Sequence, residues 1–181
     1  MEPLPVTPSG AQKARFLLDT NICIYIRRKK PDPVLRRFRT LKQGEAALSV
    51  ITFGELVYGA EKSAQRTARG RKSRSLTAFG MTSGERGGSF FKARLPRDAQ
   101  RAAALELLRE LAQVLPVLRL PETAAEAYGT IRADLERKGQ MIGNNDLWIA
   151  AHAKAAGLTL VTNNEREFRR VRGLKVENWA E

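Results

Sequence analysis

The stretch Phe16-Leu17-Leu18-Asp19-Thr20-Asn21-Ile22-Cys23-Ile24-Tyr25-Ile26 indicates the fold class of this chain. Three consecutive apolar residues are typical of a short buried strand, and the Asp-Thr-Asn sequence that follows supplies side chains that begin helices. Apolar residues then continue into a helix, which we expect to end near Pro31. A buried strand followed directly by a helix is the unit of a parallel sheet that helices cover on both faces.

The same alternation recurs along the rest of the chain. Further strands are predicted at 46–51, 114–118, 158–161 and 174–176, and the one at 114–118 contains Pro116, which is typical of a sheet edge. Further helices are predicted at 34–41, from Thr52 to about 60, and at 98–112, 121–139, 144–156 and 165–171. The fold class is therefore α/β with a central, mainly parallel sheet.

Composition excludes several classes of protein. The chain has 181 residues, a length typical of one domain, and a formal net charge of +13, which favours anionic partners and nucleic acid first. A single cysteine, Cys23, and a single histidine, His152, exclude an intramolecular disulfide framework and Cys-rich or His-rich metal centres. No run approaches the roughly 18 apolar residues that a membrane-spanning helix needs. We expect a cytoplasmic protein, because the cysteine is unpaired and no export signal is seen.

Two segments differ from the rest in composition. Residues 1–14 contain three prolines, and we expect them to form a flexible tail. Residues 64–97 carry nine Lys or Arg against one acid, Glu85, with little apolar periodicity, and we expect a flexible basic insert. The prediction is a single domain over 15–180 that this insert interrupts.

Four acids occupy positions where strands end or helices begin: Asp19, Glu55, Asp146 and Glu167. Ligand sites of parallel sheets gather outside the carboxyl ends of the strands, so these acids are candidates for a common site. Each also has a structural interpretation. Asp19 would cap the next helix, Thr52 and Glu55 match a capping box, and Asp146 suits a helix N-terminus. Glu167 would be an exposed charge among neighbouring arginines.

A cluster of these acids would require a cation. Two carboxylates about 4 Å apart repel by roughly 4 kcal/mol at an effective dielectric constant near 20. Oxygen ligands without His or Cys select Mg²⁺ or Mn²⁺. Such an ion activates water and neutralises charge at a phosphodiester, while a positive protein surface holds the polyanion. The two features together indicate a metal-dependent nuclease.

Four sequence motifs also resemble those of a known family. They are Leu18-Asp19-Thr20-Asn21, then 49–62 (SVITFGELVYGAEK), 142–153 (IGNNDLWIAAHA) and 160–168 (LVTNNEREF) with 176–179 (VENW). In this order and spacing they resemble PIN-domain endoribonucleases of the VapC toxin type, found in type II toxin–antitoxin pairs. The resemblance covers most of 15–63 and 98–180.

The resemblance implies a three-layer α/β/α domain with Mg²⁺-dependent hydrolysis of RNA, often tRNA or rRNA. Asp19, Glu55 and Asp146 match the family's metal-binding acids, and Glu167 matches a fourth acidic position. Implied partners are a cognate antitoxin and a second copy of the chain in a homodimer. The polar positions that commonly line the family's pocket match Thr162, Asn163 and Asn164.

Chemistry adds two candidates and leaves alternatives open. Thr20 or Asn21 would orient an acid or a phosphate oxygen beside Asp19. Water activated by the metal would attack the phosphate. The acids do not distinguish RNA from DNA, so a DNA-directed nuclease remains an alternative. A further alternative is a catalytically inactive PIN-like protein that binds antitoxin or nucleic acid.

Overall fold

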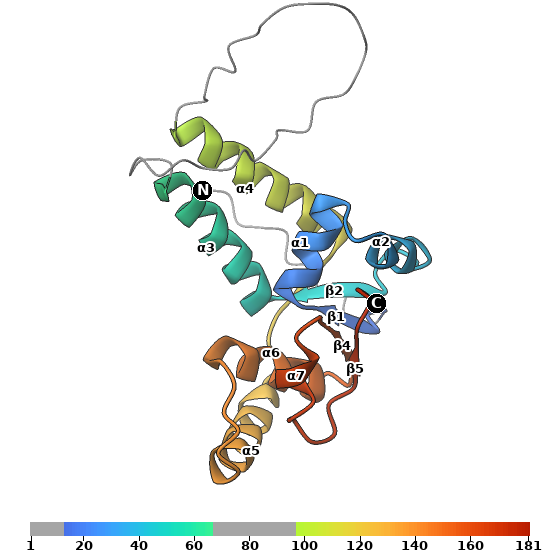
Figure 1. Ribbon diagram of the computed structural model, residues 1–181, viewed down its shortest axis with the longest axis vertical. Helices are drawn as coiled ribbons and strands as arrows, with labels where there is room; N and C mark the ends of the chain where they lie inside the picture. The colour runs from blue at the N-terminus through green and yellow to red at the C-terminus, as the bar shows by residue number, and fades with distance from the viewer. Residues whose placement is uncertain (1–12, 67–96) are drawn as a thin grey trace, which may run out of the picture.

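A parallel sheet forms the centre of the computed structural model, which describes residues 13–66 and 97–181 (Figure 1). Over these residues five strands lie in the order β3-β2-β1-β4-β5, and every neighbouring pair is parallel. The strands are β1 (Phe16–Leu18), β2 (Ala46–Ser49), β3 (Val117–Leu118), β4 (Thr159–Val161) and β5 (Val176–Glu177). The predicted parallel sheet is confirmed, with the strand after Pro116 at an edge.

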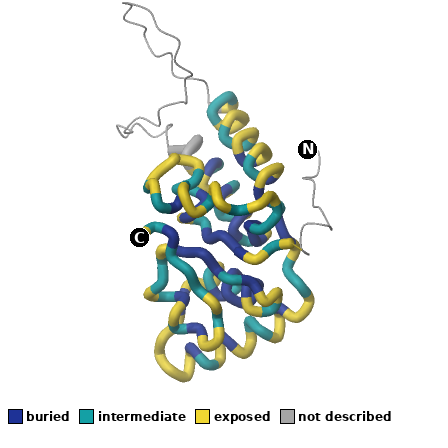
Figure 2. Tube along the Cα trace, turned by 90° about the vertical axis from the view of Figure 1, so that its right-hand side faces the viewer, coloured by how far each residue is buried: buried dark blue, intermediate teal, exposed yellow. Residues whose placement is uncertain are grey.

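Helices cover both faces of the sheet. They are α1 (Thr20–Arg28), α2 (Asp32–Arg39), α3 (Val50–Arg66), α4 (Arg97–Val114), α5 (Ala124–Arg137), α6 (Asn144–Ala155) and α7 (Glu165–Phe168). Leu18 points into a core that α1, α2, α3 and α4 share, whereas Leu17 points into a second core with α5, α6 and α7. Figure 2 shows the buried strands between exposed helical surfaces. Because side chains of a strand alternate between faces, these two cores are the two interfaces of a three-layer α/β/α domain.

The junction between β2 and α3 differs from the prediction. The strand predicted over 46–51 ends at Ser49, and α3 begins at Val50. The Ser49 hydroxyl accepts a hydrogen bond from the Ile51 backbone N–H at 3.1 Å, as a helix-capping side chain does. Thr52 therefore lies inside the first turn, fully buried, and the capping box predicted for Thr52 and Glu55 is wrong.

The buried His152 supports this junction from α6. Its Nδ1 atom lies 3.0 Å from the Ser49 hydroxyl oxygen. Burial lowers the pKa of His152 to about 4, so the ring is neutral near pH 7. The histidine thus has the core role that its apolar helix favours, and it ties α6 to the start of α3.

The predicted tail and insert fall largely outside the described residues. At the boundaries of the insert, α3 continues to Arg66 and α4 begins at Arg97. These two helices pack side by side and are joined by an ion pair from Arg101 Nε to Glu61 Oε1 at 2.7 Å. Their ends at 66 and 97 lie away from the sheet (Figure 1). No helix in the described part of the chain is long and apolar enough to cross a membrane.

Candidate active site

Four acids meet at the edge of the sheet where the strands end. Asp19 directly follows β1, Glu55 lies in the second turn of α3 after β2, Asp146 lies in the first turn of α6, and Glu167 lies in α7 after β4. Burial raises the pKa of Asp19 and of Asp146. The charges of Glu55 and Glu167 raise the pKa of Asp19 further, and those of Asp19, Glu167 and Glu55 do the same for Asp146. We call these residues the four-acid cluster.

Asp19 is the most buried member, with 5% of its surface exposed. Its Oδ1 accepts a hydrogen bond from the Thr20 backbone N–H, and its Oδ2 accepts one from the Thr162 hydroxyl, both at 2.7 Å. Burial raises its pKa and outweighs these two bonds, which act in the opposite direction. Asp19 therefore both caps α1 and belongs to the cluster, so the two interpretations of this residue are compatible.

Glu55 is held by side chains from two other elements. The Thr20 hydroxyl of α1 donates to Glu55 Oε2, and the Asn145 side-chain amide of α6 donates to Oε1 at 2.8 Å. The sequence argument included Thr20 but missed Asn145. Its position beside Asp146 in the first turn of α6 was the available signal. Adjacent helical residues point in different directions, and here they reach two different sides of one site.

Asp146 has the most perturbed carboxyl group of the cluster. Its pKa rises to about 7, first because of burial and then because of the charges of Asp19 and Glu167. It lies close to Gly143, where an added Cβ would come within 3.3 Å of Asp146 Oδ2. An open pocket of about 350 Å³ adjoins it, lined by Glu55, Gly143, Asn144, Asn145 and Asp146.

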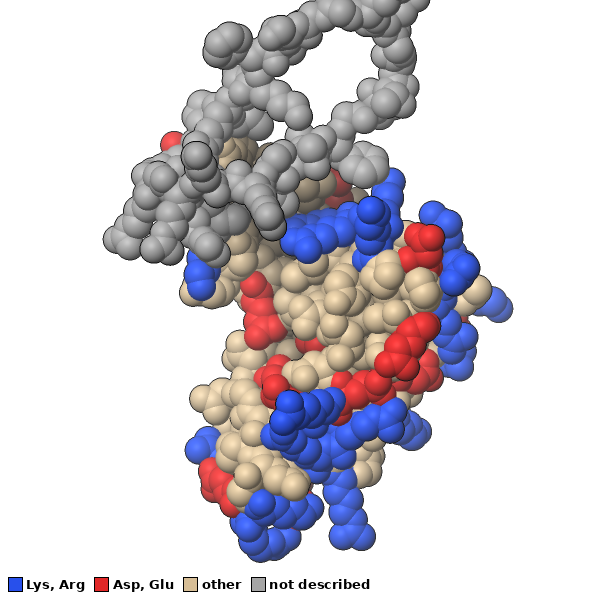
Figure 3. All heavy atoms as spheres, in the orientation of Figure 1, with Lys and Arg blue, Asp and Glu red and all other residues tan. Residues whose placement is uncertain are grey.

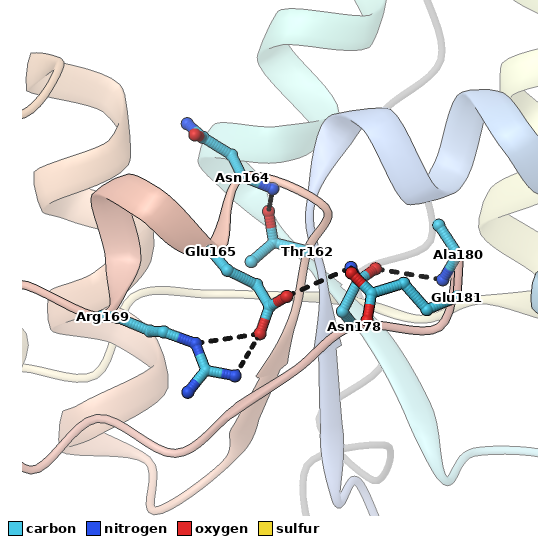
Figure 4. Close-up of polar contacts among 7 residues, drawn as sticks. All are labelled: Thr162, Asn164, Glu165, Arg169, Asn178, Ala180 and Glu181. Atoms are coloured by element: carbon cyan, nitrogen blue, oxygen red, sulfur yellow. Dashed lines mark hydrogen bonds and ion pairs between the residues drawn. The ribbon is translucent and has the colours of Figure 1, made fainter.

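The polar residues predicted after β4 differ in where their side chains lie. The Thr162 hydroxyl, besides donating to Asp19, accepts the backbone N–H of Asn164 at 2.9 Å (Figure 4). The Asn163 amide donates to the Tyr25 hydroxyl at 2.8 Å. Asn21, on α1, is exposed. Thr162 thus contacts an acid directly, whereas Asn163 is engaged with a tyrosine of α1.

The two glutamates of α7 have separate environments. Glu165 pairs with Arg169 and accepts a hydrogen bond from the Asn178 amide at 3.2 Å (Figure 4). The bond from Arg169 holds the pKa of Glu165 below its usual range. Glu167 instead interacts with Asp19 and Asp146. Only the second glutamate therefore belongs to the four-acid cluster.

The donor set of this cluster suits a hard divalent cation. Neighbouring carboxylates whose charges repel are stabilised by a positive ion between them, and oxygen donors select Mg²⁺ or Mn²⁺. Across 13–66 and 97–181, no three Asp, Glu, His or Cys side chains already enclose a site for a metal ion. The carboxylates thus converge on one edge of the sheet without closing around a common point.

Comparison with known proteins agrees with the fold. The sequence profile of the PIN domain matches residues 16–174. The chain belongs to the PIN-domain family. Among curated PIN-domain relatives, the tRNA(fMet)-specific endonuclease VapC of Shigella flexneri is 37% identical over 166 residues, which cover 92% of this chain and 98% of the relative. Ribonuclease VapC2 of Haemophilus influenzae is 34% identical with the same coverage.

Solved structures give the same grouping. The DNA-bound VapBC complex of Salmonella typhimurium contains a chain that matches with a TM-score of 0.67 and 34% identity, covering 92% of this chain and 98% of that one. VapBC2 of Rickettsia felis, bound to a promoter DNA fragment, matches with a TM-score of 0.63 and 32% identity, covering 91% and 98%. This PIN-domain chain therefore groups with the VapC ribonucleases, whose activity depends on metal in general.

Proposed function

We propose that this PIN-domain chain is the endoribonuclease toxin of a type II toxin–antitoxin pair and that it hydrolyses RNA at the four-acid cluster with Mg²⁺. The observation that carries the proposal is the convergence of four carboxylates on one edge of the sheet, with the pKa of Asp146 raised to about 7. Such a cluster is costly without a cation and suited to one.

In this proposal Asp19, Glu55 and Asp146 hold the cation, and Glu167 completes the set. When bound, the cation neutralises charge at the phosphate and activates water. Thr162 and the Thr20 backbone fix both oxygens of Asp19, while Asn145 and the Thr20 hydroxyl fix both oxygens of Glu55. Asp146 holds a proton below about pH 7, which it must release before it can act as a metal ligand.

The substrate and partners follow by analogy with the relatives. The Shigella flexneri relative is named as specific for a tRNA, so we propose structured RNA of that class as the substrate. The Salmonella and Rickettsia structures are VapBC complexes, which supports an antitoxin protein as the partner. The net charge of +13 supports binding of a polyanion. A homodimer and a cytoplasmic location complete the proposal.

The test is cleavage of total RNA by the purified full-length protein with Mg²⁺, with EDTA and with the Asp19→Asn variant as controls. Discrete fragments that require both Mg²⁺ and Asp19 are expected. Full activity of the variant would contradict the proposed site. Cleavage of DNA but not RNA would support the DNA-directed alternative, and no cleavage by folded, partner-free protein would support the inactive PIN-like alternative.

A further inference from the structure

A dense group of cations lies beside the four-acid cluster and has no role in the chemistry described above. Residues 27–42 contain eight Lys or Arg and one acid, Asp32. We call this segment the basic lobe; it comprises the C-terminal end of α1, the whole of α2 and the turns that follow each. All eight cations are exposed: Arg27, Arg28, Lys29, Lys30, Arg36, Arg37, Arg39 and Lys42.

Most of these cations form no ion pair with an acid in the described part of the chain. Arg37 pairs with Glu177 at 3.6 Å and lies 5.9 Å from the ring centres of Phe16 and Trp179, so its role is structural. No ion pair with a described acid is found for Arg27, Arg28, Lys30, Arg36 or Arg39. By contrast, three cations on α5 and at its C-cap are paired with acids of that helix: Arg132, Arg137 and Lys138.

One helix connects the four-acid cluster to the basic lobe. Helix α1 begins directly after Asp19 and ends in the lobe, and a helix of nine residues is about 13 Å long. Figure 3 shows Lys and Arg side chains over the C-terminal end of α1 and over α2, with acidic side chains across the middle of the face. A polyanion that reaches the four-acid cluster can therefore contact the lobe at the same time.

The chemistry of the lobe fits a phosphate backbone better than a protein partner. Protein interfaces have a core of apolar and aromatic side chains within a polar rim. The exposed large hydrophobic residues of the described chain all lie outside 27–42: Val50, Tyr58, Leu107, Val114 and Met141. A surface with many cations and no exposed large apolar side chain is typical of sites that bind nucleic-acid phosphates.

We propose that the basic lobe binds the phosphate backbone of the RNA substrate and supplies affinity that does not depend on the metal site. This inference rests on the proposed function, because it takes RNA as the substrate. It assigns to Arg27, Arg28 and Lys30 a binding role that is separate from cleavage.

The test measures RNA binding without metal. Fluorescently labelled bulk tRNA is titrated with full-length protein in EDTA, by anisotropy, from about 50 to 200 mM salt. The lobe variant is Arg27→Gln/Arg28→Gln/Lys30→Gln, and the control of equal charge is Arg132→Gln/Arg137→Gln/Lys138→Gln on α5. The lobe variant should bind tRNA at least about tenfold more weakly at the lowest salt, and the slope of log K against log [salt] should be shallower by about 2. The affinity of the control variant should change by less than about twofold.

Equal weakening of both variants would overturn the proposal, because net charge alone would then account for binding. Absence of tRNA binding by the parent protein would overturn it as well. Normal tRNA binding by the lobe variant would also overturn the proposal, even if that variant lost affinity for the antitoxin. Binding that depends on the lobe without any Mg²⁺-dependent cleavage would support the lobe and contradict only the proposed function.

Discussion

At the scale of single residues, the cluster combines two fixed carboxylates with one that holds a proton. Asp19 and Glu55 each accept hydrogen bonds on both oxygens. Burial, followed by the charges of Asp19 and Glu167, raises the pKa of Asp146 to about 7. The ionised cluster is therefore under repulsion that a cation relieves, and this repulsion has consequences for stability.

We predict that Asp146→Asn stabilises the metal-free protein relative to the parent, and that this stabilisation grows as pH rises. The folded pKa of about 7 exceeds 3.8, the ordinary pKa of an aspartate, so between these values the native state binds more protons than the unfolded state. The parent protein loses stability as pH rises through this window, and the variant avoids that loss. Urea denaturation in EDTA at about pH 5 and about pH 8 measures the difference.

The comparison between variant and parent removes the contributions of groups that do not interact with Asp146. His152, with its pKa lowered to about 4, acts in the opposite direction between about pH 4 and 6.5, but it does so equally in both proteins. A difference in unfolding free energy that is the same at both pH values would contradict the assigned state of Asp146.

We predict that Asn145→Ala reduces RNA cleavage by about three- to tenfold and weakens Mg²⁺ binding, with the fold unchanged. The change removes the donor to Glu55 Oε1. A hydrogen bond to a charged group contributes about 1.5–3 kcal/mol, and solvent reduces this at a partly exposed site. Gln140→Ala, which truncates an exposed amide outside the pocket, is the control. Equal effects of the two variants would contradict a positioning role for Asn145.

At the scale of elements, the boundaries that the sequence predicts well are those where an apolar run meets a helix-capping side chain. Phe16-Leu17-Leu18 followed by Asp19 gives both the end of β1 and the start of α1. The β2–α3 boundary was misplaced because Val50 and Ile51 are β-branched, whereas the cap that begins the helix is the buried Ser49. β-Branched residues favour strands only weakly, and capping and packing override that preference.

The sequence identifies the acids of the candidate site, but it does not identify the hydrogen bonds that hold them. Acids at strand ends follow from the parallel topology, since those ends meet at one edge. The Asn145–Glu55 bond joins residues 90 positions apart, so it depends on how α6 packs against α3. The neighbouring Asp146 makes Asn145 a candidate, but no local pattern shows that its partner is Glu55.

We predict that Ser49→Ala destabilises the protein by about 1–2 kcal/mol. Loss of a helix-capping side chain costs about that much, and the substitution also removes the Ser49 hydroxyl from His152 Nδ1. The midpoint of urea unfolding should fall with an unchanged slope. Thr130→Ala is the control, since its hydroxyl bonds the Glu126 carbonyl on an exposed helix and its loss should cost less than about 0.5 kcal/mol. Similar losses in the two variants would contradict the capping role.

At the scale of the whole molecule, the prediction that a basic insert interrupts a single domain can be tested by replacing most of the insert. Replacing residues 67–96 with a short Gly/Ser linker should leave the protein folded and its cleavage rate at saturating RNA within about threefold of the parent. The reason is that α3 ends at 66 and α4 begins at 97, and both of these helix ends lie away from the sheet (Figure 1). Circular dichroism and single-turnover cleavage are the measurements. Loss of folding would show that the replaced segment contributes to the core.

The central claim is that acids from four separate places in the chain act as one cation site. Calorimetric titration of Mg²⁺ into the full-length protein tests this claim most directly. The account predicts one binding event that each of four shape-preserving substitutions weakens: Asp19→Asn, Glu55→Gln, Asp146→Asn and Glu167→Gln. The control Glu165→Gln, which removes a carboxylate paired with Arg169 instead, should have no effect on Mg²⁺ binding. Mg²⁺ binding that is absent from the parent, or unchanged by these four substitutions, would contradict it.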